Sequence, residues 1–281
     1  MELTQEFTRI EPKPFLRWAG GKNWLVKYLE RSLTDFTFNN YHEPFLGGAS
    51  LFLFFRPQNT SYLCDVNTDL IETYAIVRDH VERLISEMQN YCNDEDFYYS
   101  LRNEKFRSKI KRAAKFIYLN QTSFNGIYRV NLDGVYNVPY GFRSKNFLDA
   151  DNLRLVSKAL RGVHLSSNDF NSTMEFVKKG DLVFLDPPYT VSHNNNGFIK
   201  YNQKLFSLED QYRLAKYIES IKKKGAYYIL TNAAHSKIAE IFEQIGSKIK
   251  LTRASLIGGT NAQRGHISEY LFTNISGLKK Y

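Results

Sequence analysis

Residues 182–189 read LVFLDPPY, four apolar residues followed by Asp186, two prolines and Tyr189. A short apolar run of this kind predicts a buried β-strand. Proline has no backbone N–H group and fixes φ, so two prolines in succession must end that strand. We therefore expect a strand that stops at Asp186 and then presents rigid backbone carbonyls outward, as a surface that binds hydrogen-bond donors.

Similar apolar runs alternate with amphipathic segments along the rest of the chain, and turn residues separate them. We expect strands at residues 41–45, 61–65, 163–166, 182–186 and 226–231, and helices at residues 23–33, 68–79, 208–223 and 237–244. This alternation predicts an α/β fold. Ligands of open α/β sheets bind outside the carboxyl ends of the strands, so acidic residues at the strand ends are the first candidates for a site.

Composition indicates a globular protein with a polyanionic partner. The chain has 281 residues, of which 43% are hydrophobic and 24% are charged, and this excludes a mostly disordered or collagen-like polymer. Lys and Arg together number 38 against 29 Asp and Glu, so the formal net charge is +9. A basic chain of this kind favours nucleic acid as the partner.

Residue counts and spacing exclude several classes of site. Cys64 and Cys92 are too few for a disulfide framework, and the 6 histidines lack the spacing of a helical metal site, so we expect no metal and a reducing cytoplasm. Residues 1–14 carry charges and no apolar run, so we expect no signal peptide. The longest apolar stretch, residues 44–55, is shorter than the roughly 20 residues of a membrane-spanning helix, so we expect no membrane partner.

Residues 98–116 are the most basic segment, with interleaved Tyr and Phe and a single acid among the cations Arg102, Lys105, Arg107, Lys109, Lys111, Arg112 and Lys115. The segment predicts one basic amphipathic helix, and residues 127–138 predict a hairpin that turns at residues 131–134. Such an insert is typical of a nucleic-acid reader, whose phosphate contacts would be Lys105, Lys109, Lys111 and Arg112. A solvated helix face beside an ordinary surface hairpin is the alternative.

Asp186 and the three residues after it suit one kind of ligand. An exocyclic amine on a planar base presents two N–H donors and a flat ring. The carboxylate of Asp186 and the carbonyl of Pro187 offer two acceptors, and Tyr189 offers a ring for stacking. The alternative is a strand-terminating turn that carries a surface tyrosine.

Two glycine turns lie nearer the N-terminus. Residues 14–22, PFLRWAGGK, fail the phosphate-loop pattern, because Leu16 and Asn23 replace its first glycine and its Ser or Thr. Residues 43–50, EPFLGGAS, lack the glycine spacing of a dinucleotide site, but Asp65 ends the next predicted strand, where a carboxylate can bind both hydroxyls of a ribose. A cofactor with one nucleoside is therefore favoured, although an ordinary helix-capping turn would also explain residues 14–22.

In their order along the chain, these segments resemble the Dam-type DNA adenine-N6 methyltransferases, including methylases of restriction systems that act on GATC. The match covers nearly the whole chain and ends in residues 264–274. It implies a Rossmann-like, seven-stranded class I methyltransferase sheet with an inserted, mainly helical target-recognition domain that carries a β-hairpin. Residues 1–67 and 156–281 would form the catalytic domain, and residues 68–155 the recognition domain.

The resemblance also implies roles for individual residues. Those implied to bind or enclose S-adenosyl-L-methionine are Trp18, Lys22, Glu43, Phe45, Gly47, Asp65, Asp169, Phe170 and Asp186. Those implied to hold an adenine flipped out of double-stranded DNA are Asp186, Pro187, Pro188 and Tyr189. Those that match the family's DNA-reading hairpin are Asn125, Arg129, Asn137 and Pro139, of which Arg129 would read a guanine. Ala49 departs from the family, which usually has a glycine at that place.

Other functions compete with this interpretation. N4-cytosine methylation acts on a similar amine, but its enzymes commonly carry Ser in place of Asp186. Protein-glutamine methylation would favour Asn there and needs no basic insert. A DNA-binding regulator with a lapsed methyltransferase sheet would have no reason to keep Trp18, Lys22, Asp65 and the DPPY segment. In a bacterium or a phage-infected cell, the enzyme would serve either solitary marking or a restriction system, beside an endonuclease that acts on the same site without a stable complex.

Overall fold

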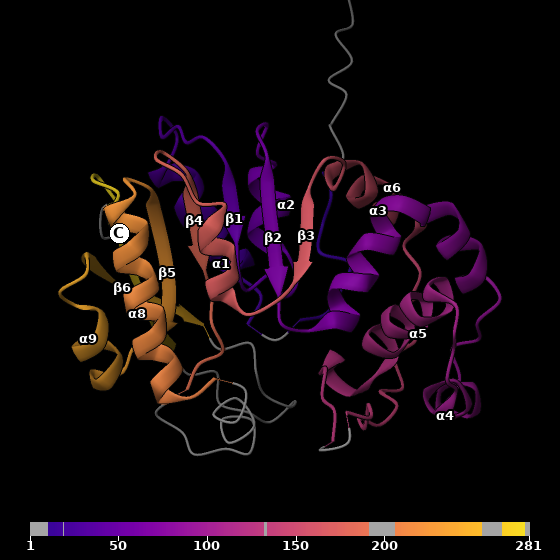
Figure 1. Ribbon diagram of the computed structural model, residues 1–281. Coiled ribbons are helices and arrows are strands. Elements are labelled where there is room, and N and C mark those ends of the chain that lie inside the picture. The colour runs from indigo at the N-terminus through magenta and orange to yellow at the C-terminus, as the bar shows by residue number, and fades with distance from the viewer. Residues whose placement is uncertain (1–10, 19, 132–133, 191–205, 255–265, 279–281) are drawn as a thin grey trace, which may run out of the picture. The chain divides into compact units, whose positions relative to one another are not determined.

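The structure, a computed structural model, describes residues 11–18, 20–131, 134–190, 206–254 and 266–278 (Figure 1). Within these ranges the chain groups into two compact units. Unit 1 comprises the described residues within 1–22, 47–56 and 68–161, and unit 2 comprises those within 23–46, 57–67 and 162–281. The described parts of residues 1–22 and 47–56 thus belong to the same compact unit as most of the predicted recognition domain. The functional division into a catalytic and a recognition domain stays a prediction.

Unit 2 contains a seven-stranded sheet in the order β3-β2-β1-β4-β5-β7-β6. Its strands are β1 (Tyr41–Glu43), β2 (Ser61–Asp65), β3 (His164–Ser167), β4 (Leu182–Leu185), β5 (Tyr227–Ala233), β6 (Ser247–Ala254) and β7 (His266–Thr273). Neighbours from β3 to β5 are parallel, whereas β7 runs antiparallel to both β5 and β6. The expected α/β class and the seven-stranded sheet are confirmed.

The order of the strands places a switch point between β1 and β4. From β1 the chain proceeds outward to β2 and β3, and from β4 it proceeds to β5 on the other side. All residues of β4 are buried, as its apolar sequence predicted. In open α/β sheets, ligands bind beyond the carboxyl ends of the strands at such a point. The end of β4, where Asp186 follows, is therefore the place to examine.

The described helices of unit 2 are α1 (Asn23–Ser32), the 3₁₀ segment η2 (Phe170–Glu175), α8 (Leu208–Lys223) and α9 (Ser236–Phe242). Ser207 and Asp210 form a capping box that starts α8. Alternate residues of β4 and β5, such as Val183 and Tyr228, join the apolar stripe of α8 in one buried cluster. The period of two in the strands and of three to four in α8 thus builds the core that supports the sheet edge.

Unit 1 is mainly helical. It contains α2 (Ser50–Phe55), α3 (Thr68–Met88), α4 (Glu95–Asn103), α5 (Lys109–Thr122), the 3₁₀ turn η1 (Phe124–Gly126) and α6 (Ala150–Ala159). Helices α3 and α5 pack side by side (Figure 1). A second core under α4 and α5 is rich in tyrosine, and the hydroxyl of buried Tyr98 donates to the carbonyl of Val138 at 2.9 Å. Buried tyrosines of this kind fasten the loop after α5 to the helices.

The prediction of one basic helix over residues 98–116 is wrong. Helix α4 ends at Asn103, and α5 begins after Ser108, whose hydroxyl accepts a hydrogen bond from the backbone N–H of Lys111. Serine is a strong N-cap, and this local signal overrides the continuous basic pattern. Helix α3 extends beyond its predicted end to Met88 and has non-helical backbone angles at His80, directly after the predicted end at residue 79.

Candidate active site

Acidic side chains stand at the carboxyl ends of the parallel strands of unit 2. Glu43 is the last residue of β1 and Asp65 the last of β2, whereas Asp169 and Asp186 follow β3 and β4. The carboxyl ends of parallel neighbours meet at one edge of a sheet, so these carboxylates share that edge. Glu43, which is buried and accepts a hydrogen bond from the hydroxyl of Tyr41 at 3.0 Å, flanks the switch point with Asp186.

Asp186 is oriented by a neighbour on β5. The hydroxyl of Thr231 donates to Oδ1 of Asp186 at 2.8 Å. The contact follows from strand register, because Leu185 pairs with Leu230 and the next residues of the two strands lie alongside each other. Thr231 is buried, so this bond fixes the rotation of the carboxylate.

Tyr189 is oriented in the same way by β7. Its hydroxyl donates to Oε2 of Glu269 at 2.5 Å, and Glu269 is buried opposite Ala233 of β5. Burial, together with the negative charges of Asp186 and Glu269, raises the pKa of Tyr189 well above its usual value. The hydroxyl therefore stays protonated as a donor at neutral pH, and the plane of the ring is held from its far end.

A buried chain of amide and hydroxyl groups anchors the residue after Tyr189. Asn232 of β5 donates from Nδ2 to Oε1 of Gln211 at 2.9 Å, and Nε2 of Gln211 donates to Oγ1 of Thr190 at 2.9 Å. Thr190 in turn donates to the carbonyl of Phe206 at 2.9 Å. Buried polar groups that are paired throughout hold a unique geometry, so this chain fixes the path of the backbone beyond the prolines.

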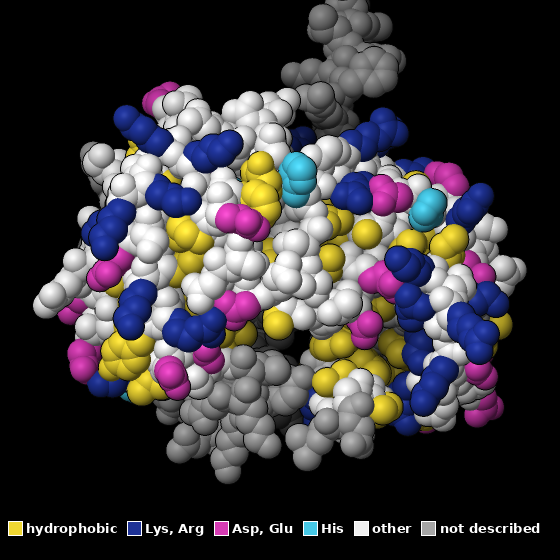
Figure 2. All heavy atoms as spheres, in the orientation of Figure 1, with side chains coloured by type: hydrophobic (Ala, Val, Ile, Leu, Met, Phe, Trp, Pro, Cys, Tyr) yellow, Lys and Arg dark blue, Asp and Glu magenta, His cyan; other side chains and the backbone are white. Residues whose placement is uncertain are grey.

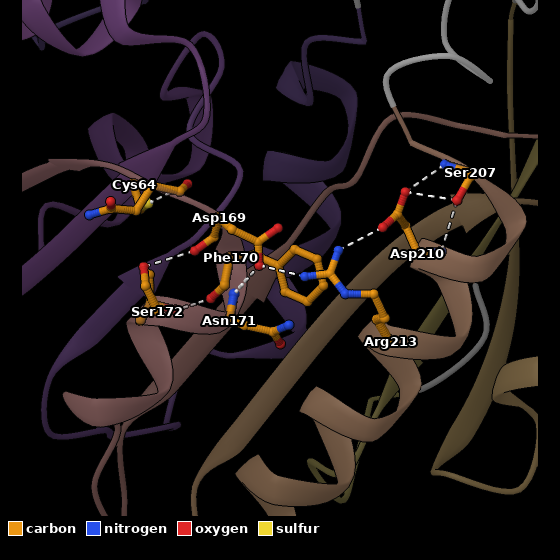
Figure 3. A network of polar contacts seen from close by, with 10 residues as sticks. Cys64, Asp169, Phe170, Asn171, Ser172, Ser207, Asp210 and Arg213 are labelled. Carbon is orange, nitrogen blue, oxygen red and sulfur yellow. Dashed lines mark hydrogen bonds and ion pairs between the residues drawn. The ribbon is translucent and has the colours of Figure 1, made fainter.

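Asp169 and Phe170 follow β3 and start η2 (Figure 3). Oδ1 of Asp169 accepts from the backbone N–H of Asn171 at 3.0 Å and from Nη2 of Arg213 at 2.8 Å. Phe170 is buried, and its ring centroid lies 5.3 Å from that of Phe45, which is partly exposed after β1. Asp169, Phe170 and Phe45 thus offer a carboxylate beside aromatic rings at the sheet edge.

Within unit 1, the segment before Trp18 is tied to the end of α5. The side-chain amide of Asn120 pairs with both backbone groups of Arg17: Oδ1 accepts from its N–H at 2.7 Å, and Nδ2 donates to its carbonyl at 2.8 Å. Gln121 donates from Nε2 to the carbonyl of Phe15 at 2.7 Å. Two neighbouring residues of α5 therefore hold the predicted cofactor segment against the end of that helix.

Trp18 itself contacts two residues of unit 1 that have predicted roles. One belongs to the predicted DNA-reading hairpin, and the other is predicted to bind the cofactor. Its ring stacks on Tyr128 of the predicted DNA-reading hairpin, with centroids 5.4 Å apart. On another side the indole approaches the backbone so closely that a Cβ added at Gly47 would lie 2.8 Å from it. Gly47 also has φ of +46°, so both space and backbone conformation require glycine there.

The predicted hairpin forms. The backbone N–H of Asn137 donates to the carbonyl of Arg129 at 3.2 Å, and that of Asn131 donates to the carbonyl of Val135 at 2.9 Å, while residues 132–133 of the turn lie outside the described residues. Across the ribbon, Nε of Arg129 donates to Oδ1 of exposed Asn137 at 2.8 Å. Asn125 is exposed with φ of +53°, directly before the ribbon, and Pro139 is exposed directly after it.

The four residues predicted to contact phosphates divide into two groups. Lys105, Lys109 and Lys111 are exposed, and Figure 2 shows dark blue side chains gathered over α3 and α5. Arg112 instead holds Glu72 of α3 with two hydrogen bonds, of 2.7 and 2.6 Å. The first turn of α5 contains no acid, so its cations oppose the helix dipole, and an anion bound there would relieve that repulsion.

Sequence reasoning missed the residues that support the site. Thr231, Gln211 and Arg213 lie in ordinary strand and helix patterns, and only the fold shows what they contact. Glu269 carried a usable signal, because it interrupts the apolar pattern of residues 267–272, ISEYLF. An acid at the centre of a buried strand needs a partner, and the partner is Tyr189.

Known proteins resemble this chain over most of its length. Residues 18–255 match the family model of the D12 class N6 adenine-specific DNA methyltransferases. A type II methyltransferase of Methanocaldococcus jannaschii is 36% identical over 247 residues, 80% of this chain and 85% of that protein. A type II methyltransferase of Lactococcus lactis subsp. cremoris is 32% identical over 286 residues, 98% and 99% of the two chains. A DNA adenine methylase of Haemophilus influenzae is 31% identical over 254 residues, 86% of each chain.

In the part of the chain that the structure describes, no helix has the length and apolar character needed to cross a membrane.

Proposed function

The chain belongs to the D12 class of N6 adenine-specific DNA methyltransferases, and on this premise we propose that it moves a methyl group from S-adenosyl-L-methionine to N6 of an adenine flipped out of double-stranded DNA. The observation that carries the proposal is the orientation of Asp186 by Thr231 at the end of β4, directly before the two prolines. Asp186, Pro187, Pro188 and Tyr189 are assigned to the target base.

Positioning and electrostatics supply the catalysis in this proposal. The lone pair of adenine N6 is delocalised into the ring, which makes the nitrogen a poor nucleophile. The carboxylate of Asp186 and the carbonyl of Pro187 accept hydrogen bonds from its two N–H groups and draw the nitrogen toward tetrahedral geometry. The nitrogen gains a positive charge as its new bond to the methyl group forms, and the carboxylate stabilises this charge until the nitrogen loses one of its two protons. No covalent enzyme intermediate is needed.

The donor set of unit 2 fits the cofactor. When bound, S-adenosyl-L-methionine supplies an electrophilic methyl group on a sulfonium. Asp65 suits the two ribose hydroxyls, and its Oδ1 is already oriented by the backbone N–H of Asn67 at 2.9 Å. Asp169 and Phe170 suit the adenine. Glu43 and Phe45 stand at the end of β1 between these groups and Asp186 in strand order. The roles of Trp18, Lys22 and Gly47 of unit 1 toward the cofactor stay predictions.

DNA binding is assigned to the hairpin and to three lysines. Unstacking a base costs a few kcal/mol, which stacking on Tyr189 and phosphate contacts from Lys105, Lys109 and Lys111 would offset. A two-stranded ribbon fits the major groove, where Arg129 is assigned to the two acceptors of a guanine. Replacing Arg129 by Ala should lower activity on the proper site at least about tenfold more than on sites altered at that guanine. An equal loss on every sequence would make Arg129 a phosphate or structural residue.

GATC is the proposed target, from the resemblance to the Dam-type enzymes. A role in a restriction system is favoured over solitary marking, because the relatives from Methanocaldococcus jannaschii and Lactococcus lactis are both named type II methyltransferases. The partner in that case is an endonuclease that cuts the same sequence. DNA from cells that express the protein should then resist an endonuclease that cuts unmethylated GATC, and full cleavage would reject this site.

The direct test is transfer of labelled methyl from S-adenosyl-L-methionine to synthetic duplexes. One duplex carries GATC, and matched duplexes carry a single change at each position. We expect N6-methyladenine in the digested GATC duplex and little label in the others. Label in N4-methylcytosine, or label in protein alone, would reject the proposed reaction.

A further inference from the structure

Arg213 links helix α8 to the start of η2 in unit 2 (Figure 3). From α8 its Nη2 reaches Oδ1 of Asp169 at 2.8 Å, and its Nη1 reaches Oδ1 of Asp210 at 2.6 Å. Its Cζ lies 5.0 Å from the centroid of the Phe170 ring. One guanidinium therefore contacts both consecutive residues, Asp169 and Phe170, that the proposed function assigns to the adenine of the cofactor.

Arg213 is itself held in place. Asp210 is part of the capping box of α8, in which its Oδ2 accepts from the backbone N–H and the hydroxyl of Ser207, both at 2.8 Å. The guanidinium of Arg213 is planar and its donors form a rigid fork, so binding Asp210 through one nitrogen sets the direction of the other. The start of α8 thus fixes where Asp169 can place its carboxylate.

In the carboxylate of Asp169, Oδ1 accepts the hydrogen bonds from the described residues, and Oδ2 accepts none of these. Among the described residues, every hydrogen bond to its carboxylate goes to Oδ1, from Asn171 and from Arg213. Its backbone carbonyl accepts from the hydroxyl of Ser172 at 2.8 Å, which fixes the main chain as well. The side chain is 49% exposed, so Oδ2 can meet a ligand.

We propose that Arg213 is a positioning residue for the adenine of the cofactor: it locks Asp169 so that Oδ2 accepts a hydrogen bond from the 6-amino group. This inference rests on the proposed function, which places S-adenosyl-L-methionine at Asp169 and Phe170. The contact with the ring of Phe170 keeps the guanidinium on one side of that residue. Without Arg213, Asp169 and Asp210 would repel each other, and Oδ1 of Asp169 would keep the hydrogen bond from the backbone N–H of Asn171 but lose the one from the guanidinium.

The test measures recognition of the 6-amino group rather than activity. Calorimetry compares S-adenosylhomocysteine with S-inosylhomocysteine, in which an oxo group replaces the amino donor. A hydrogen bond to a carboxylate is worth about 1.5–3 kcal/mol, so the parent protein should prefer the adenosyl compound by at least about tenfold. In Arg213→Ala this preference should fall to about twofold or less. The KM for S-adenosyl-L-methionine should rise, with kcat within about twofold of the parent.

Arg154 provides a matched control in unit 1. It also bridges two carboxylates, Glu82 and Asp151, and its side chain is 43% exposed against 40% for Arg213. Exposed ion pairs of this kind contribute little to stability, so both Ala variants should fold. Arg154→Ala should keep the parent preference for the adenosyl compound. Arg213→Lys keeps the charge but loses the fork, so it should behave like Arg213→Ala.

The outcomes distinguish a failure of the proposed function from a failure of this inference about Arg213. If the parent protein binds neither compound, the proposed function fails. If the parent prefers the adenosyl compound and Arg213→Ala keeps that preference, Arg213 is only a link between η2 and α8, and this inference fails while the function stands. Full recovery of the preference in Arg213→Lys would also overturn it, because charge alone would then suffice.

Discussion

The hydroxyl of Tyr189 donates to Oε2 of Glu269 across 2.5 Å, so the aromatic ring after the two prolines is held by a buried acid on the antiparallel strand β7. This contact links the parallel part of the sheet, where β4 ends, to its antiparallel edge. It fixes the position of the hydroxyl end of the ring that the proposed function assigns to stacking on a base. Glu269 therefore belongs to the support of the proposed target site, although it stands far from Tyr189 in sequence.

Tyr189→Phe should test this support. The variant keeps the ring but removes the hydroxyl that donates to Oε2 of Glu269, so we expect kcat to fall about tenfold, against a hundredfold or more for Tyr189→Ala. Because the pKa of Tyr189 is raised, parent activity should show no loss from tyrosine ionisation up to about pH 10. A Tyr189→Phe enzyme with parent kcat would show that the hydroxyl contact does not position the ring.

A second prediction concerns stability in acid. Burial alone would raise the pKa of Asp181, but hydrogen bonds from the buried imidazole of His42 and from the backbone N–H groups of Asn40 and Lys178 outweigh it and lower the pKa below 3.8. The unfolded state then binds the proton more readily, so this stabilisation is present above about pH 4 and is lost as the pH falls through the folded pKa.

Asp181→Asn should therefore lower the free energy of unfolding by about 1–3 kcal/mol at pH 7 and flatten its decline below pH 4. Urea unfolding at pH 7, 4 and 3 measures both effects. Asp79 is the control, because its pKa is also lowered, by the hydrogen bond from Arg78, but its side chain is 47% exposed. If Asp79→Asn and Asp181→Asn change the free energy of unfolding equally, the buried pair of His42 and Asp181 contributes no more to stability than an exposed one.

The sequence predicted the parts of the fold that depend on local patterns. Residues 61–65 and 208–223 have the predicted boundaries, because apolar spacing and a capping box define them directly. The break between α4 and α5 was missed, since a single serine cap decided it against a continuous basic pattern. Strands β6 and β7 were not predicted individually.

The site was predictable only in part, for a related reason. Asp65, Asp169 and Asp186 are recognisable because acids at strand ends stand out in one dimension. Thr231 and Arg213 act through contacts between separate elements, which depend on strand register and on the direction of α8. Such contacts need the three-dimensional arrangement, whereas Glu269 could have been found as an acid within an apolar strand.

A third prediction separates DNA contacts from structural ones in α5. Changing Lys109 and Lys111 together to Gln should weaken binding on all sequences and reduce the log–log salt slope by about two units, one for each lost phosphate contact. Arg112→Gln should leave that slope unchanged and lower the free energy of unfolding, because it breaks the pair with Glu72. Fluorescence anisotropy over a salt series checks the slope, and an unchanged slope for the lysine variant would assign these residues to a solvated face.

A fourth prediction concerns Ala49, where the resemblance to the Dam-type enzymes implies a glycine. Ala49 is buried with φ of +55°, a left-handed conformation that costs an L-residue other than glycine about 1–2 kcal/mol. Ala49→Gly relieves this strain but adds freedom to the unfolded chain, so we expect a net gain of up to about 1 kcal/mol in the free energy of unfolding. Ala113→Gly, inside α5, should lose about 1 kcal/mol instead. Destabilisation by both changes would contradict this account of residue 49.

The most direct measurement is the single-turnover rate of N6-methyladenine formation on a GATC duplex by the parent, Asp186→Ala, Thr231→Val and Thr231→Ser. We expect Asp186→Ala to lose transfer by several orders of magnitude while remaining folded, and Thr231→Val to lose about tenfold because Asp186 is no longer oriented. Thr231→Ser keeps the hydroxyl and should stay near the parent rate. Transfer by Asp186→Ala within about tenfold of the parent, equivalent to only ~1.4 kcal/mol of barrier, would contradict the central claim that this carboxylate accepts the amine of the target base.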